Sequence, residues 1–203
     1  MNRMLRRSLF AAVLPVVVFV AGAALMILAS GHRAVERRLA LLPVEEYRQP
    51  INLRLSGYDL ATVQAQWTIF IKSSAATNSD AAELPKLQRS ERLILYFDLF
   101  FPLLYGGSFL VSFFLLWDGL GRPFAPAWWI ALVVVVMLAD WTENVIQLQQ
   151  LARLITGGPE ALQAGWLQAA SLGTRVKLHS FMACVLCVWF LAARLAWRNW
   201  PKR

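Results

Sequence analysis

Residues 128–147 read WWIALVVVVMLADWTENVIQ, an uncharged apolar run that passes directly into a polar stretch. Asp140, Glu143, Asn144 and Gln147 follow one another at intervals of three and four residues, so a helix would carry them all on one face. Charged side chains at membrane depth are costly unless they face protein or water. The stretch therefore predicts a membrane-spanning helix with a polar site on the side that faces the protein.

The composition supports a membrane protein. Of the 203 residues, 58% are hydrophobic and only 16% are charged, which is unlike a soluble domain. The net charge is +8, but the basic residues gather at the ends of apolar runs and in one loop, without a nucleic-acid-binding pattern. We expect membrane lipids as partners, with a larger membrane complex or a homo-oligomer also open, and no nucleic acid.

Four apolar runs are long enough to cross a bilayer, at residues 9–29, 93–117, 128–150 and 172–195. The first would form about 31 Å of helix at 1.5 Å per residue. Its length favours a retained anchor, although Ala29-Ser30-Gly31 would also suit cleavage of a signal peptide. The predicted fold is all-α, a four-helix transmembrane bundle in which residues 1–203 form a single membrane domain.

Residues 31–91 are predicted to form a helical extracytoplasmic loop. Apolar and polar residues alternate over 51–56, as in a short strand, and residues 73–82 are small and polar, as in a flexible loop before a helix that starts near Pro85. Asp59 should cap a helix that either packs on the bundle or lies on the membrane as a lid. Its apolar stripe is Leu60, Val63, Trp67, Phe70 and Ile71.

The distribution of basic residues predicts the topology. Lys and Arg mark the N-terminus, the 118–127 loop and the C-terminus, whereas the 156–171 loop contains neither. Because short cytoplasmic loops are enriched in Lys and Arg, we expect both termini in the cytoplasm and residues 31–91 outside.

Counting along each predicted helix brings several polar residues to one layer in the outer half of the bilayer. Such a layer could be a hydrogen-bond and ion-pair network that fixes helix packing, a proton or cation relay, or a ligand site. A lone histidine beside a lysine is a poor ligand set for a metal, so neither metal nor cofactor is predicted. The candidates are Asp98, Asp140, Glu143, Asn144, Lys177 and His179, with Tyr105 on the same face as Asp98.

Part of this pattern resembles a family of uncharacterised bacterial four-span integral membrane proteins. The shared elements are Trp67, Asp98-x-x-Phe101-x-x-x-Tyr105-Gly106, Asp140-x-x-Glu143-Asn144 and Lys177. The resemblance covers roughly residues 58–180. It implies four helices and an inner-membrane location, and it supplies no activity.

Cys184-Val185-Leu186-Cys187 is similar to the motif of quinone-linked, disulfide-forming membrane oxidases and vitamin K epoxide reductases. By that analogy Cys184 and Cys187 would pass electrons from thiols to a quinone. The second cysteine pair of those oxidases is absent from this sequence, and cysteine is also an ordinary apolar packing residue.

No nucleotide-binding or hydrolase motif is present in the sequence, so an enzyme is not expected. The expected function is a non-catalytic accessory or ligand-binding component of the membrane. A small transporter or ion relay is the first alternative, and a thiol oxidoreductase is the second.

Overall fold

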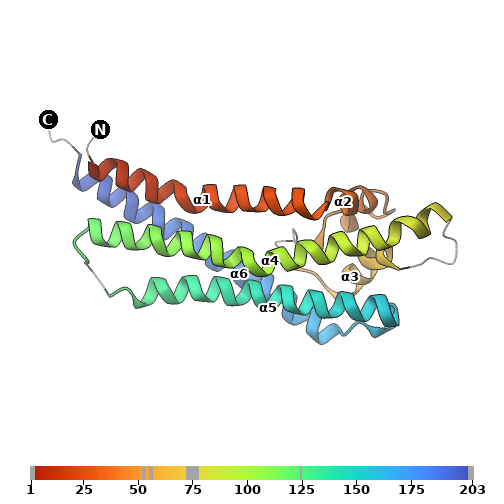
Figure 1. Ribbon diagram of the computed structural model, residues 1–203. Coiled ribbons are helices and arrows are strands. Elements are labelled where there is room, and N and C mark those ends of the chain that lie inside the picture. Colours follow the sequence, from red (N-terminus) through yellow and green to blue (C-terminus); the bar gives the residue numbers. More distant parts are fainter. Residues whose placement is uncertain (1–2, 52–53, 55–56, 72–77, 124, 201–203) are drawn as a thin grey trace. The chain divides into compact units, whose positions relative to one another are not determined.

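The computed structural model describes residues 3–51, 54, 57–71, 78–123 and 125–200, and these residues form helices and turns without a strand (Figure 1). Long helices dominate the fold: α1 (Arg3–Ser30), α4 (Asn78–Gly119), α5 (Ala127–Gly157) and α6 (Ala164–Arg198). The shorter elements are α2 (Arg33–Leu39), η1 (Glu45–Arg48), α3 (Leu60–Trp67), η3 (Thr68–Phe70) and η4 (Pro159–Ala161). The all-α prediction is confirmed.

All four long helices are long and apolar enough to cross a membrane, over Arg3–Ser30, Glu83–Gly119, Ala127–Gly157 and Ala164–Arg198. Each of the four predicted runs lies inside one of them. The helices extend past the apolar runs, because backbone hydrogen bonding continues wherever the flanking polar residues are good helix formers. The number and type of the long elements are therefore as the sequence predicted.

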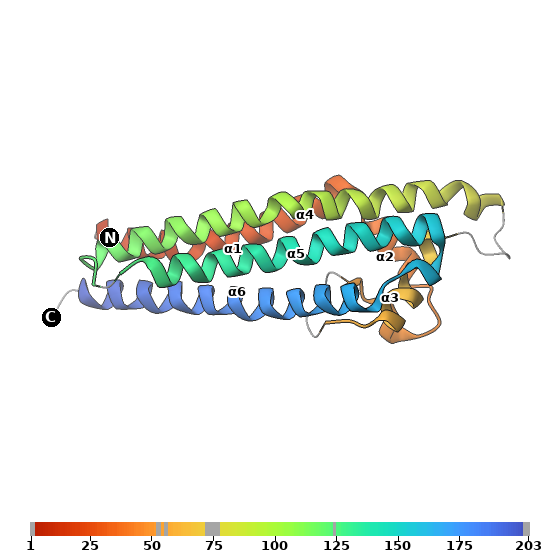
Figure 2. The same ribbon diagram turned by 90° about the horizontal axis from the view of Figure 1, so that it is seen from below.

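The chain divides into two compact units, and each takes a segment from every long helix. The first unit contains residues 1–23, 101–138 and 176–203, and the second contains residues 24–100 and 139–175. Figure 2 shows the same helices from below. Neither unit is a continuous stretch of sequence, so each is held together by contacts between helix segments that are distant along the chain.

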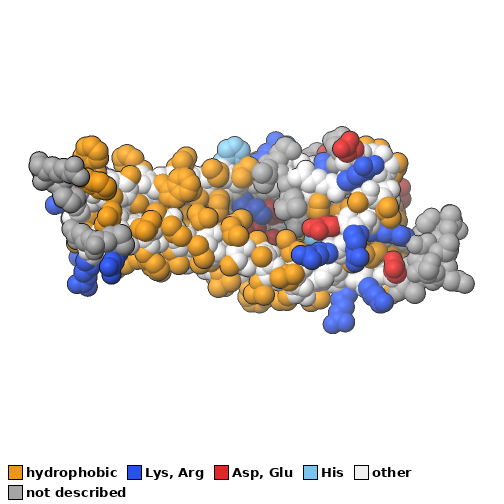
Figure 3. Space-filling model, turned by 90° about the horizontal axis from the view of Figure 1, so that it is seen from above, with side chains coloured by type: hydrophobic (Ala, Val, Ile, Leu, Met, Phe, Trp, Pro, Cys, Tyr) orange, Lys and Arg blue, Asp and Glu red, His pale blue; other side chains and the backbone are white. Residues whose placement is uncertain are grey.

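The first unit has an aromatic core and an apolar surface. Tyr105 packs against Phe101, Phe19 and Phe181, with ring centroids 5.2, 6.0 and 5.8 Å away. On the outside, large apolar side chains such as Phe190 are exposed, and Figure 3 shows hydrophobic side chains over most of the visible face of this unit. A surface of this kind suits lipid rather than water.

Three parts of the chain meet at one end of the first unit. Arg7 Nη2 lies 2.9 Å from Asp118 Oδ2, which joins the start of α1 to the α4–α5 turn. Arg198 Nη1 donates to the Leu120 carbonyl at 3.0 Å, which joins the end of α6 to the same turn. Both termini lie at this end (Figure 1). A chain that crosses a membrane an even number of times would have both termini on the same side, as in this arrangement.

The second unit contains the helices between α1 and α4. As predicted, Asp59 caps α3, because its Oδ1 accepts from the Thr62 N–H at 2.8 Å. This bond lowers the pKa of the Asp59 carboxyl. The predicted apolar stripe is buried at Val63, Trp67 and Phe70, in one core with Ile94, Leu95, Ile146, Leu151, Leu154 and Leu167 of the long helices. The helix packs on the bundle and is not a surface lid.

Two local predictions are wrong in the described residues. The helix α4 begins at Asn78, so residues 78–82 are helical and Pro85 lies inside the helix rather than at its start. The reason is visible in the sequence, because Asn-Ser-Asp followed by Glu83 is itself a pattern that starts helices. In the predicted strand, the described residues Ile51 and Arg54 make bonds typical of turns and not of a strand: Arg54 N donates to the Ile51 carbonyl and Gly57 N to the Arg54 carbonyl, both at 3.0 Å. Residues 52, 53, 55, 56 and 72–77 lie outside the described residues.

Candidate functional site

The polar face of α5 is buried in the second unit. Asp140, Glu143, Asn144 and Gln147 are each at most 2% exposed. Their spacing of three and four residues puts them on one face, as the sequence predicted, and that face points into the protein. Buried carboxylates and amides need partners, so the arrangement of their hydrogen bonds decides what this face can do.

One group of bonds centres on Glu143 and Gln147. Glu143 Oε1 accepts from Thr174 Oγ1 of α6 at 2.6 Å and from Gln147 Nε2 at 3.1 Å. Gln147 Nε2 also donates to the Tyr58 hydroxyl at 2.8 Å, so both of its amide protons are used. The bonds join α5 to α6 and to the segment before α3.

A second group centres on Asn144. Its Nδ2 donates to Asp140 Oδ1 at 3.0 Å and, at 3.4 Å, to the backbone carbonyl of Asp98 on α4. Proline at position 102 has no N–H for that carbonyl, which is its usual partner four residues earlier in a helix. The next carbonyl, that of Leu99, accepts from Trp141 Nε1 at 2.7 Å. Asn144 of α5 therefore supplies the Asp98 carbonyl with the donor that Pro102 lacks. We call Tyr58, Asp140, Glu143, Asn144, Gln147 and Thr174 the polar cluster.

Close backbone approaches surround the polar cluster. Tyr58 N donates to Ser171 Oγ at 2.9 Å, and the preceding Gly57 has φ +87°. A β-carbon at Gly57 would lie 2.8 Å from Arg175 Nε and closer still to Ser171 Oγ. On α6, a β-carbon at Gly173 would lie 3.1 Å from the Ala139 carbonyl. Small residues thus let α6 approach both α5 and the segment before α3.

The other sequence candidates have different surroundings. Asp98 has a half-buried side chain, and its backbone carbonyl is the group that meets Asn144. Tyr105, 1% exposed, belongs to the aromatic core of the first unit. Lys177 is half-buried and His179 is exposed, and both also belong to the first unit. The structure therefore joins Asp140, Glu143 and Asn144 through one helix face.

The cysteine pair consists of free thiols in the first unit, with Cys184 buried and Cys187 half-buried on α6. Electron transfer between these thiols and a quinone stays a prediction. Among the described residues, no group of three or more His, Cys, Asp or Glu side chains is arranged to hold a metal ion.

Sequence reasoning missed a second buried polar pair, His32 and Glu91. His32 Nδ1 lies 3.6 Å from Glu91 Oε2, and His32 is only 2% exposed. Burial lowers the pKa of His32 to about 4. One signal was present: Glu91 continues a buried stripe that runs from Leu87 to Leu95. No comparable signal marked Tyr58, because loop contacts have no sequence period.

Comparison with known proteins finds no matching family model, no similar curated protein and no similar solved structure. What the fold and site define is a class: an all-α protein whose four long apolar helices are candidate membrane spans, with charged residues buried among them.

Proposed function

We propose that the protein is a non-catalytic, multi-pass component of the bacterial inner membrane, with cytoplasmic termini and residues 31–91 outside. In this proposal the polar cluster is a structural joint that holds three helices and the segment before α3 together. One observation supports it above the others: the hydrogen bonds of the cluster run between separate elements of the second unit, from α5 to α4, α6 and Tyr58.

The energetics also favour a joint. A buried polar group without a partner costs about 1–3 kcal/mol, whereas one with a partner stabilises the packing that supplies the partner. Polar side chains serve membrane bundles in this way, because lipid gives no hydrophobic drive for helix association. The bond from Asn144 to the Asp98 carbonyl, which receives no N–H from Pro102, is a structural task that needs no substrate.

The test uses isosteric changes that remove charge and keep hydrogen-bonding capacity. If the cluster is a joint, the Asp140→Asn, Glu143→Gln double variant should fold and complement a deletion strain, because amides can still bond. Thr174→Val should lower the free energy of unfolding by about 1–3 kcal/mol, because Glu143 loses a buried donor. Glu160→Gln, at an exposed carboxylate in the α5–α6 turn, is the control. It should change neither complementation of the deletion strain nor the free energy of unfolding.

A proton or cation relay is the second candidate, favoured by the deep burial of two carboxylates one turn apart, Asp140 and Glu143. A relay would lose activity in the double variant while the protein stayed folded, which would overturn the structural joint. Substrate-dependent proton flux in liposomes by the purified protein alone would support the relay. Co-purification with a larger membrane complex would support an accessory role.

A further inference from the structure

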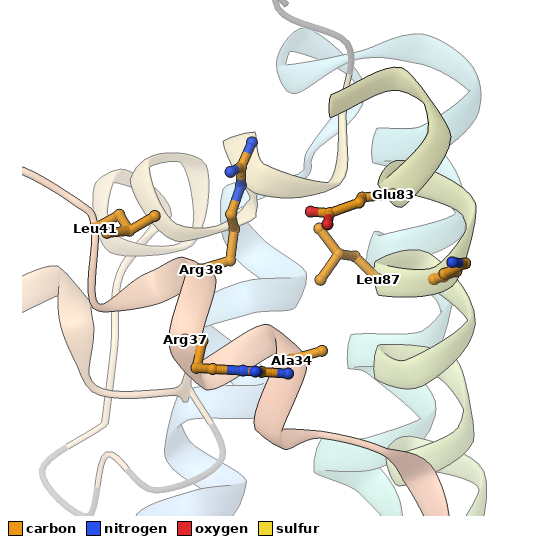
Figure 4. Close-up of a pocket in the computed structure, with 7 residues that line it drawn as sticks. Ala34, Arg37, Arg38, Leu41, Glu83 and Leu87 are labelled. Atoms are coloured by element: carbon orange, nitrogen blue, oxygen red, sulfur yellow. The ribbon is translucent and has the colours of Figure 1, made fainter. Parts of the chain in front are cut away.

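A pocket of about 380 Å³ lies between α2 and the start of α4, in the second unit. One wall consists of Ala34, Arg37 and Arg38 of α2, which share one helical face, and of Leu41, which follows the end of α2. The α4 wall is Glu83, Lys86 and Leu87. Figure 4 shows Glu83 and Leu87 pointing from α4 toward α2, where Arg38 lies. The volume is within the range of small-ligand sites.

The charge of the lining selects an anion. The lining contains three cations, Arg37, Arg38 and Lys86, and one carboxylate, Glu83, which leaves a net formal charge of +2. The planar guanidinium of arginine matches the oxygens of phosphate and carboxylate groups in a fork, and lysine adds a mobile point charge. Two adjacent arginines on one stripe suit the several oxygens of a phosphate better than a single carboxylate.

Two contacts tie the segment just before α2 to α4, next to the pocket. Ser90 Oγ donates to the carbonyl of Ser30, the last residue of α1, at 2.8 Å. One residue further along α4, Glu91 lies 3.6 Å from His32, which immediately precedes α2. The start of α2 is therefore held beside α4 without a ligand, and a held backbone reduces the free energy lost to ordering when a ligand binds.

The pocket also lies at the level where a membrane has phosphate. Ala34 stands just after the turn at Gly31, which follows Ser30, the end of a candidate span, and Leu87 precedes the apolar run at Leu93 by about 9 Å of helix. The headgroup layer occupies about 5–8 Å on each side of the hydrocarbon core. Leu41, which is 73% exposed, gives the pocket an apolar edge.

We propose that this pocket binds a phosphate-ester anion, with its oxygens on Arg37, Arg38 and Lys86 and its apolar part against Leu41 and Leu87. The phosphate belongs to the headgroup of an anionic phospholipid or to a soluble phosphate compound. The inference goes beyond the proposed function and uses it only for the depth of the pocket; the lining charges stand without it.

The experiment measures binding to the purified full-length protein in a neutral detergent. The probes are dioctanoyl phosphatidylglycerol, dioctanoyl phosphatidylcholine and inorganic phosphate. We expect the dissociation constant for phosphatidylglycerol to be at least about tenfold lower than for phosphatidylcholine, and the Arg37→Gln, Arg38→Gln double variant to lose about tenfold, from two charge-assisted contacts. Glu83→Gln should tighten binding about twofold to fivefold, because it removes a repelling charge at an exposed position.

Arg33→Gln is the matched control, since Arg33 is an exposed cation on α2 that does not line the pocket. An equal loss in Arg33→Gln would overturn the proposal, and so would equal binding of the two lipids together with no binding of inorganic phosphate. If the double arginine variant does not fold, Lys86→Gln and Glu83→Gln on the surface of α4 must still shift binding in opposite directions. Competition by inorganic phosphate would assign a soluble ligand, and its absence a lipid. The binding measurements do not involve Asp140 or Glu143. A failure of the phosphate proposal can therefore be told apart from a failure of the proposed function.

Discussion

His32 and Glu91 show what burial does to a single pair of side chains. Neither ring nitrogen of His32 has a hydrogen-bond partner among the described residues, and the nearest carboxylate oxygen is 3.6 Å away. With its pKa lowered to about 4, the imidazole is neutral at physiological pH. A neutral histidine gains little from the Glu91 carboxylate, so the pair contributes mainly by packing between α2 and α4.

His32 should contribute to a dependence of stability on pH. Unfolded His32 binds a proton near pH 6.5 but the folded protein only near pH 4, so the contribution of His32 to the free energy of unfolding should fall as pH drops through this window. At pH 5 the loss of this contribution should be about 2 kcal/mol. The measurement is the difference in thermal stability between the natural protein and His32→Gln in detergent, and this difference should shift against the natural protein between pH 7.5 and pH 5. A difference that stays the same at both pH values would contradict the burial of a neutral His32.

At the scale of a helix, α4 depends on its neighbour. Pro102 cannot donate to the Asp98 carbonyl, and the side chain that donates to this carbonyl instead is Asn144 of α5. A helix with an internal proline would ordinarily be weakened at that point by about 3 kcal/mol or more. Here the donor of an adjacent helix recovers part of that loss, which ties the stability of α4 to its packing against α5.

This dependence can be measured as a coupling energy. Asn144→Leu should lower the free energy of unfolding by about 1–3 kcal/mol in the natural sequence. In a Pro102→Ala background the loss should be smaller, because alanine at that position supplies the N–H that the Asp98 carbonyl needs. Gln147→Leu is the control. Its effect should be the same in both backgrounds, because the bonds of Gln147 to Glu143 and Tyr58 do not involve the Asp98 carbonyl. Equal effects of Asn144→Leu in both backgrounds would contradict the role given to Asn144.

Elements differed in how far the sequence predicted them. Long apolar runs predicted α1, α4, α5 and α6, because spanning a bilayer requires both length and hydrophobicity. Asp59 predicted its own cap, because capping is local. Tyr58 and Thr174 were not predicted as members of the polar cluster, because their roles depend on which segments meet in space. His32 and Glu91 were missed because polar residues near a charged segment are usually exposed.

At the scale of the whole molecule, the contacts of Asp118 and Leu120 bear on topology. They join the α4–α5 turn to Arg7 of α1 and to Arg198 of α6, the two terminal helices. The two terminal segments are rich in Arg and Lys and the turn carries Arg122, in agreement with the distribution of Lys and Arg expected on the cytoplasmic side.

Topology is tested with reporters of location. Because α4 begins at Asn78, an insertion at Ala76 between η3 and α4 avoids interrupting the helix. A reporter there should be active outside the cytoplasm, while one at the C-terminus should be active inside, since an odd number of spans separates them. Activity of both fusions on the same side would rule out the four-span topology.

The bond between Asn144 of α5 and the Asp98 carbonyl also has a consequence for biogenesis. When the ribosome has made α4 and not yet α5, Pro102 supplies no N–H to the Asp98 carbonyl, and Asn144, which donates to that carbonyl in the folded protein, has not been made. An exposed carbonyl is costly in hydrocarbon, so α4 gains by staying near water or the insertion machinery until α5 has been synthesised. The two helices should therefore enter the lipid as a pair, and the order of translation becomes part of how this bundle forms.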